Sequence, residues 1–307
     1  MHEQLEQLLH DLANFAELGA DARADCRRRA ARVALESDED AESFLSALNG
    51  IAETRSDEQA LRGDQALWSA LLGAVHRALA QPTAHVQAET VRRATSLYQW
   101  LGADSQARHL LLACLAASDR RDALAAFAEL VVADPPARPQ DAALAFVPLF
   151  QRRDDAAASM FPRLLDALEH PAVAAVILDL ANFLCRQRKV APHPASSRAT
   201  QLGVLLGALV SRLARLEEQP GEYASSPAAL HALVGECVEL IVTLCHALGM
   251  IGDESLCGKL RQALELSHRR LRTEAAFSLA QLGDDEGLKT LAEMAAEPVV
   301  RPRALAY

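Results

Sequence analysis

Aromatic residues are scarce in this chain of 307 residues, at 4% of the total, although hydrophobic residues of all kinds make up 50%. Its 14 glycines and 13 prolines also fall below the roughly 7% and 5% of an average protein. An all-β sandwich needs frequent Gly- and Pro-rich turns, so the composition argues against that class. The core must be built from aliphatic side chains, and long helices are the elements that the composition favours.

Positive charge is in deficit as well. The 41 acidic residues outnumber the 31 basic ones and give a formal net charge of −10. A protein that draws its affinity from phosphate groups needs the opposite sign, so nucleic acid is disfavoured as a partner.

Long apolar runs and a secretion signal are missing too. The longest runs, 172–178 and 203–210, stop well short of the roughly 18 residues that cross a bilayer, so we expect no membrane span. The first four residues are polar and acidic and lead directly into a helical pattern, without the cationic and apolar regions of a signal peptide. The sequence therefore predicts a cytoplasmic protein.

Closely spaced cysteine pairs are lacking, and lysine is rare. The six cysteines are scattered without a C-x-x-C pair and lie in apolar stretches, which is typical of reduced, buried thiols. Only three lysines accompany many arginines, a bias of GC-rich genomes that indicates a bacterial origin.

Helical periodicity is the main feature that is present. Leucines at 202, 205, 206, 209, 213 and 216 recur at steps of three and four and form one apolar stripe. No stretch alternates polar and apolar residues with period two. Two longer breaks, 188–197 and 217–227, interrupt the helical pattern, and the first predicts a boundary between an N-terminal half, 1–187, and a C-terminal half, 188–307.

An internal repeat appears in the C-terminal half. The pattern L-x-x-φ-G-D, where φ is an apolar residue, occurs at 248–253 and again at 279–284, an offset of 31 residues. Residues 271–294 resemble the unit of the HEAT-repeat family in its short bacterial form. The resemblance implies an all-α fold, a right-handed α-α superhelix of antiparallel helical hairpins. We expect it to be regular in 188–307, irregular in 1–187, continuous across the two halves, and to end within a repeat.

The physics of stacking agrees with the resemblance. A hairpin of about 30 residues cannot bury its apolar face alone and must pack on its neighbours. Small residues such as Ala275, Ala276 and Ala280 would let neighbouring helices approach closely. Since stacked repeats present an extended concave surface, we predict a non-enzymatic scaffold that binds another protein along that surface.

Other functions stay open as alternatives. HEAT-like enzymes include bilin lyases and alkylpurine DNA glycosylases, and the second type requires a cationic face for DNA. The diiron hydroxylases of this class use His-Glu dyads, where this chain has Thr273-Glu274 and Pro302-Arg303. In the N-terminal half, Ala125 to Phe127 leading to Val132 to Pro135 suggests a tetratricopeptide-like, peptide-binding alternative.

No catalytic, metal-binding or cofactor-binding residues are predicted. Common catalytic motifs are missing, and pairs such as Cys245-His246 lack the spacing that lets two ligands share an ion. The acidic residues 38–42 directly follow Ser37 and predict a capped first helical turn, not a calcium loop.

The candidate partner-binding residues are Arg186, Arg188, Lys189 and His193. They form the most cationic segment expected at the surface of an acidic protein and would receive an acidic partner.

Two further sets of residues receive structural roles. Arg272 and Arg301 begin the second helix of their repeats, and the family resemblance implies ion pairs there between neighbouring repeats. Trp68, Tyr98 and Trp100 lie among leucines and are expected in the core.

Overall fold

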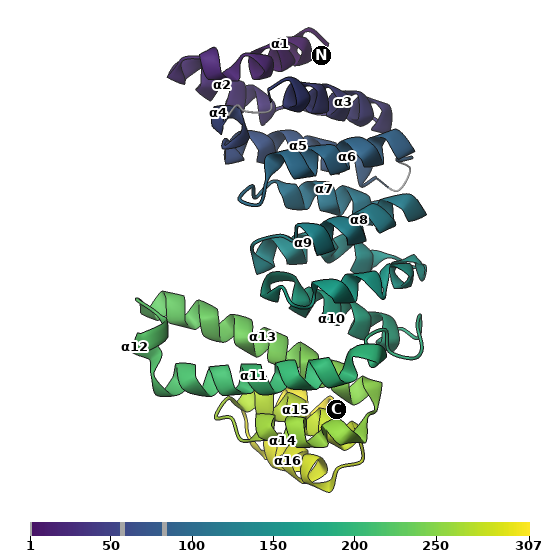
Figure 1. Cartoon of the computed structure of the whole chain (residues 1–307), viewed down its shortest axis with the longest axis vertical. Helices are drawn as coiled ribbons and strands as arrows, with labels where there is room; N and C mark the ends of the chain where they lie inside the picture. Colours follow the sequence, from purple (N-terminus) through teal and green to yellow (C-terminus); the bar gives the residue numbers. More distant parts are fainter. Residues whose placement is uncertain (1, 56–58, 82–84) are drawn as a thin grey trace. The chain divides into compact units, whose positions relative to one another are not determined.

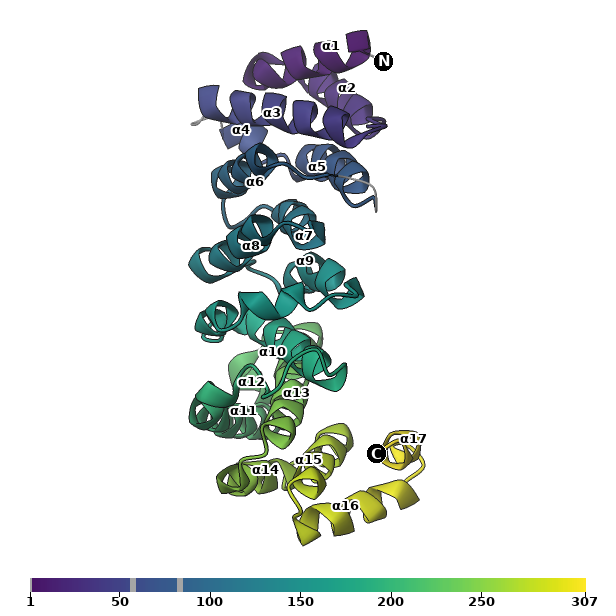
Figure 2. The same cartoon turned by 90° about the vertical axis from the view of Figure 1, so that its right-hand side faces the viewer.

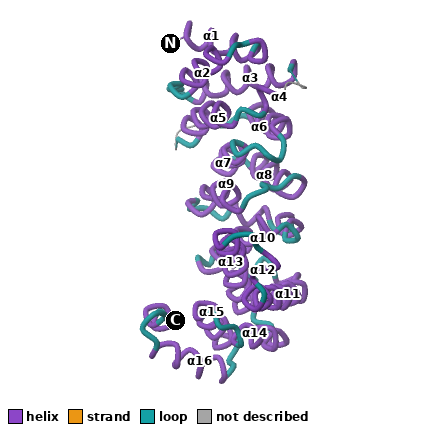
Figure 3. Tube along the Cα trace, turned by 90° about the vertical axis from the view of Figure 1, so that its left-hand side faces the viewer, coloured by secondary structure: helices purple, strands orange, loops and turns teal. Residues whose placement is uncertain are grey.

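The computed structural model describes residues 2–55, 59–81 and 85–307, with side chains from Leu5 onward. Within these ranges all regular structure is helical and no strand occurs, which confirms the all-α prediction (Figures 1 and 3). The first four residues, which carry the expectation of no secretion signal, lie partly outside the described part. The chain forms two compact units, Met1–Val173 and Ala174–Tyr307.

The first unit stacks helices in two layers. Helices α2, α5, α7 and α9 pack in succession in one layer, and α3, α6, α8 and the short helix η3 pack in the other (Figure 2). Their bounds are α1 His2–Ala13, α2 Ala20–Ala30, α3 Asp38–Thr54, α4 Gln59–Arg62, α5 Gln65–Leu79, α6 Ala88–Leu101, α7 Arg108–Ala117, α8 Arg121–Ala133, α9 Pro139–Gln151, η2 Ala156–Met160 and η3 Arg163–Ala167.

The spacing of these helices is uneven. Helices α5, α7 and α9 of one layer begin at Gln65, Arg108 and Pro139, so the step between neighbours is not constant. These three helices do not follow a strict repeat of 34 residues, and an irregular N-terminal half over 1–187 stays a prediction.

The second unit consists of the larger part of α10 (Pro171–Arg186) and three helical hairpins. The hairpins are α11 (Ala199–Glu218) with α13 (Pro227–Ile251), α14 (Cys257–Leu264) with α15 (Arg269–Gln281), and α16 (Asp285–Ala296) with α17 (Arg301–Leu305). Figure 1 shows α11 and α13 side by side, joined through the short α12 (Pro220–Tyr223). Helix α13 packs on α15, α11 on α14, and α15 on α16, as stacked HEAT hairpins do.

The repeated L-x-x-φ-G-D pattern marks the end of one helix and the start of the next. Gly252 and Gly283 both have φ near +78°, the left-handed conformation in which glycine ends a helix without steric strain. The aspartates that follow cap the next helices, because the side chain of Asp253 accepts from the Ser255 N–H and that of Asp284 from the Gly287 N–H. Ser37 caps α3 in the same way, as predicted.

The aromatic and aliphatic core follows the sequence pattern. Trp68 and Tyr98 are fully buried, and the partly buried Trp100 packs edge-on against Trp68 at 5.3 Å between ring centroids. In α11 the predicted leucine stripe faces inward, with Leu205 partly buried and the other five leucines buried.

Two helices meet the length and composition of a membrane span, namely Ser196–Glu218 and Pro227–Ile251. This signal is weak by itself, since the core helices of soluble proteins share it. In these two helices, residues such as Leu213 and Leu244 are fully buried against the rest of the protein. That the chain has no membrane span stays a prediction.

The division into compact units differs from the predicted boundary after residue 187. It falls inside α10, between Val173 and Ala174, ahead of the Pro- and His-rich loop. The loop is held to α10 by the contact between His193 and Asn182, and a boundary after residue 187 stays a prediction.

Candidate interaction site in the second unit

The structure separates the four predicted partner-binding residues. Arg186 and Arg188 are exposed at the end of α10 and just beyond it. Lys189 is half-buried, with its ammonium 5.7 Å from the centre of the Phe183 ring. His193 is only 3% exposed. Its prediction as part of an exposed cationic segment is wrong, whereas partner binding by the other three residues stays a prediction.

His193 instead has a structural position. Its Nε2 lies 3.0 Å from Oδ1 of the buried Asn182, and its Nδ1 accepts from the N–H of Ala195 at 3.2 Å. Burial lowers the pKa of His193 to about 4, so the imidazole is neutral at physiological pH. A neutral ring with both nitrogens in hydrogen-bonding contact holds the loop against α10.

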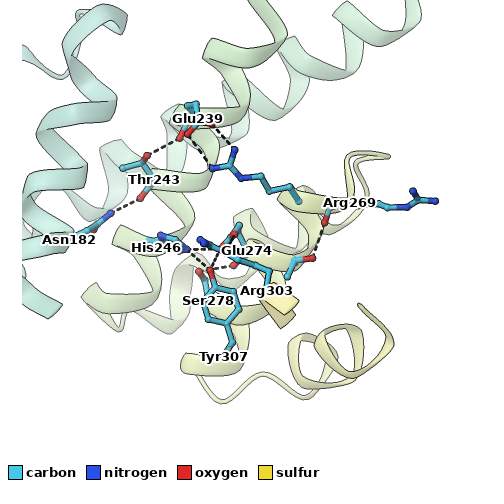
Figure 4. A network of polar contacts seen from close by, with 11 residues as sticks. Asn182, Glu239, Thr243, His246, Arg269, Glu274, Ser278, Arg303 and Tyr307 are labelled. Carbon is cyan, nitrogen blue, oxygen red and sulfur yellow. Dashed lines mark hydrogen bonds and ion pairs between the residues drawn. The ribbon is translucent and has the colours of Figure 1, made fainter. Parts of the chain in front are cut away.

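A second cluster of polar residues, which the sequence pattern did not reveal, centres on Glu274 in α15 (Figure 4). The Glu274 side chain is 0% exposed. Its Oε2 lies 2.6 Å from Nε2 of His246 on α13, and its Oε1 accepts from Nε of Arg303 on α17 at 2.7 Å. The hydroxyl of Tyr307 donates to Oε2. We call these four residues the Glu274 cluster.

Aromatic rings pack against each other in this cluster. The Tyr307 ring stacks on Phe277, with centroids 3.7 Å apart and an interplanar angle of 9°, and the His246 ring meets Phe277 edge-on at 6.3 Å. The hydroxyl of Tyr307 is thereby held next to the carboxylate. Three helices, α13, α15 and α17, are fixed together at one buried charge.

The protonation states follow from these contacts. Burial raises the pKa of Glu274, but the hydrogen bonds from His246, Tyr307 and Arg303 outweigh it and bring the pKa down to about 2. Burial and the adjacent carboxylate both raise the pKa of Tyr307. Glu274 is thus a permanent anion that receives hydrogen bonds, and it has no proton to give as a general acid near neutral pH.

A second set of polar contacts links α10, α13 and α15 beside this cluster. The amide of Asn182 donates to the backbone carbonyl of Thr243 at 3.1 Å, and the hydroxyl of Thr243 donates to the carbonyl of Glu239 at 2.8 Å. The Glu239 carboxylate pairs with Arg270 of α15 at 2.6 Å. Figure 4 shows these contacts beside those of the Glu274 cluster.

An open groove lies beside the network, at the start of α15. Its volume is about 680 Å³. We call it the arginine groove, because three arginines line it and none of its lining residues is acidic. It is lined by Ser267, His268, Arg269, Arg270, Thr273, Val299, Val300 and Arg303.

Each groove arginine is anchored by a glutamate outside the lining. Arg269 Nε lies 3.0 Å from Glu297, Arg270 pairs with Glu239, and Arg303 pairs with Glu274. The three arginine side chains remain 59%, 44% and 51% exposed, so their charge faces solvent.

The predicted ion pairs of Arg272 and Arg301 are wrong. Arg301 donates to the carbonyls of Ala295 and Ala296 and so caps the last turn of α16. Arg272 Nε is buried and has no hydrogen-bond partner in the described part of the chain. Ion pairs are formed instead by the neighbouring arginines that line the groove, Arg269, Arg270 and Arg303.

The described residues contain no arrangement suited to binding a metal ion or to thiol catalysis. No group of three or more His, Cys, Asp or Glu side chains there is placed to hold a metal ion. All six cysteines are free thiols, and burial raises the pKa of each of them, as for Cys26 (about 11) and Cys114 (about 12). Thiols of this kind are poor nucleophiles.

Little in the sequence could have pointed to the Glu274 cluster. Its members are 28 to 33 residues from Glu274, close to one repeat length. A glutamate among the apolar positions of α15 was one available signal, because an acidic residue on a buried face needs partners. The signal for the arginine groove was the Arg269-Arg270 pair in the first turn of α15, where acidic residues are favoured.

Comparison with known proteins supports the family resemblance in the second unit. Residues 226–307 match the family model for HEAT repeats. This range contains α13 to α17, the helices that form the Glu274 cluster and the arginine groove. No significant match was found among curated proteins or among solved structures.

Proposed function

We propose that this chain is a non-enzymatic HEAT-repeat scaffold of the bacterial cytoplasm that binds another protein through the exposed surface around α13, α15 and α17. HEAT repeats commonly serve as protein-interaction modules, and the match over residues 226–307 covers these helices. The concave face stays the predicted location of the partner. Six free thiols with raised pKa values support a reducing compartment.

One observation carries the proposal: the Glu274 cluster fixes the three helices α13, α15 and α17 at a buried charge and holds an exposed groove beside it. A carboxylate with 0% exposure and three hydrogen-bond donors cannot move without leaving a buried charge unpaired. The groove is therefore formed before any partner arrives, and a preformed surface loses less conformational entropy on binding.

Site-specific photocrosslinking in the source organism tests the proposal. Val299, which is 73% exposed beside the groove, is replaced by the photoreactive amino acid p-benzoylphenylalanine, and Leu144 of α9, which is 52% exposed, is replaced in a control chain. We expect a protein to be captured from position 299 and identified by mass spectrometry. Capture only from position 144 would contradict the choice of surface. Capture from neither position, together with turnover of a bilin or release of an alkylated base, would contradict a scaffold.

A further inference from the structure

We propose that the arginine groove binds an extended acidic segment of the partner protein, with its carboxylates on Arg269, Arg270 and Arg303 and an aliphatic side chain against Val299. The inference rests on the proposed scaffold function and assigns the chemistry of the partner.

Charge complementarity is the first argument. The groove concentrates three arginines and no carboxylate in its lining, within a protein of formal net charge −10. The closest contacts of Arg269 and Arg303 with their glutamates run through Nε. The two terminal nitrogens of Arg269 are not used in that closest contact, and such nitrogens form the fork that binds a second carboxylate. The Arg303 guanidinium also contacts Tyr307, with its central carbon 5.3 Å from the centre of the ring.

The start of α15 adds to this charge. Its first turn contains no acidic residue, and its N-cap residue His268 makes no side-chain capping hydrogen bond. The partial positive charge of a helix N-terminus is normally offset by an acidic residue or a capping oxygen. Here arginines stand in its place, an arrangement that an anionic ligand would stabilise.

Apolar surface in the groove favours a polypeptide over a nucleic acid. Val299 is exposed and lies beside the buried Val300. Only a polypeptide offers carboxylates and aliphatic groups on one chain. Nucleic-acid sites of this kind use aromatic side chains on which bases stack, and the nearby Tyr307 ring is already stacked on Phe277.

The binding experiment uses the full chain and a fluorescein-labelled peptide of about 12 residues built from glutamate, leucine and serine. Fluorescence anisotropy at about 150 mM salt measures its affinity and that of two control peptides, in which glutamine or lysine replaces glutamate. We expect the glutamate peptide to bind at least about tenfold more tightly than either control. The affinity should fall as salt is raised, because the contacts are ionic.

Three variants test the location. The double variant Arg269→Gln and Arg270→Gln, and separately Val299→Asp, should each weaken peptide binding about tenfold. Arg138→Gln is the matched control, because Arg138, the residue just before α9, is also 44% exposed and paired with a carboxylate. Peptide binding by this variant should be unchanged. Circular dichroism confirms that each variant is folded. None of these changes touches the buried Glu274.

Three results would overturn the inference. They are equal binding of the lysine peptide, unchanged affinity of the groove variants, and displacement of the peptide by a short DNA strand at lower concentration than by unlabelled peptide. The partner identified by photocrosslinking distinguishes the two proposals. If this partner binds the double variant Arg269→Gln and Arg270→Gln as tightly as the unmodified chain, the groove assignment fails. The scaffold function then still stands. If no protein binds either chain, the scaffold function itself fails.

Discussion

At the scale of single residues, the second unit depends on two buried groups whose pKa values are lowered, His193 and Glu274. His193 is neutral and is held by Asn182 of α10. Glu274 is a carboxylate and is held by His246 of α13. Each couples protonation to folding over a different range of pH.

His193 makes the second unit sensitive to mild acid. Its native pKa of about 4 lies below the ordinary value of 6.5, so the unfolded chain takes up a proton that the folded chain does not. The stabilisation is fully present above pH 6.5 and is lost as the pH falls toward 4, by about 3 kcal/mol in the free energy of unfolding. Urea unfolding followed by circular dichroism at pH 7 and pH 4 measures the loss.

Replacement of this histidine should remove the acid sensitivity. His193→Asn offers a donor and an acceptor without titrating, so we expect lower stability at pH 7, by about 1–3 kcal/mol, and a flatter profile between pH 6.5 and 4. His231→Asn, at an exposed position of α13, is the control and should keep the profile of the unmodified chain. An unchanged profile for His193→Asn would contradict this account.

Glu274 acts over a lower range of pH. Its native pKa of about 2 lies below the ordinary 4.5, so its stabilisation is complete above pH 4.5 and disappears as the pH falls toward 2. Glu274→Gln removes the charge that Arg303 and His246 contact, and we expect a loss of about 3 kcal/mol in the free energy of unfolding at pH 7.

The control for this prediction is Glu286→Gln, whose side chain is 59% exposed beside Arg261 and should contribute less than about 1 kcal/mol. Both variants are compared by urea unfolding at pH 7 and pH 3. Equal stabilities for the two variants would mean that the buried carboxylate has no special role in joining the helices.

At the scale of helices, close approach between neighbours depends on small residues. A Cβ atom at Gly287 of α16 would lie 2.5 Å from Cβ of Leu279 and 2.8 Å from the backbone nitrogen of Ala280 on α15. Backbone atoms cannot move aside as a flexible side chain does, so the two helices would have to separate.

Gly287→Ala should therefore destabilise the last hairpins by about 1–3 kcal/mol despite the better helix propensity of alanine. Gly258→Ala in α14 is the matched control, since no atom lies within 4 Å of its added Cβ, and it should raise stability by about 0.5–1 kcal/mol. Thermal unfolding of both variants measures the two shifts. A stabilising effect at Gly287 would contradict the close packing of α15 and α16.

Local signals predicted much of the element structure correctly. Helix ends at Gly252 and Gly283 and the caps at Asp253 and Asp284 depend on a few neighbouring residues, and all four residues lie in the repeated L-x-x-φ-G-D pattern. The same pattern could not show which arginine faces the next helix. Arg301 caps a helix end and Arg303 reaches Glu274, although they are two residues apart.

At the scale of the whole molecule, the net charge of the protein governs its non-specific binding of charged partners. A formal net charge of −10 opposes the approach of nucleic-acid phosphates, and each of the three groove arginines is already paired with a glutamate.

Binding to a random DNA duplex of about 20 base pairs at about 150 mM salt should therefore be weaker than a Kd of about 0.1 mM. Fluorescence anisotropy of a labelled duplex measures this affinity. The groove variant Arg269→Gln and Arg270→Gln serves as the comparison. A micromolar Kd that weakens steeply with salt and with the variant would favour the DNA-glycosylase alternative.

The sequence by itself determined the all-α class, the HEAT-like hairpins of the second unit, the helix ends and the aliphatic core, because these follow from interactions between residues within a few turns. Tertiary structure alone decided that His193 is buried and that His246, Glu274, Arg303 and Tyr307 meet. Such contacts join residues a full repeat apart, and their register depends on how the hairpins pack. Periodicity indicates which face of a helix is apolar, but only packing selects the polar groups that become buried together.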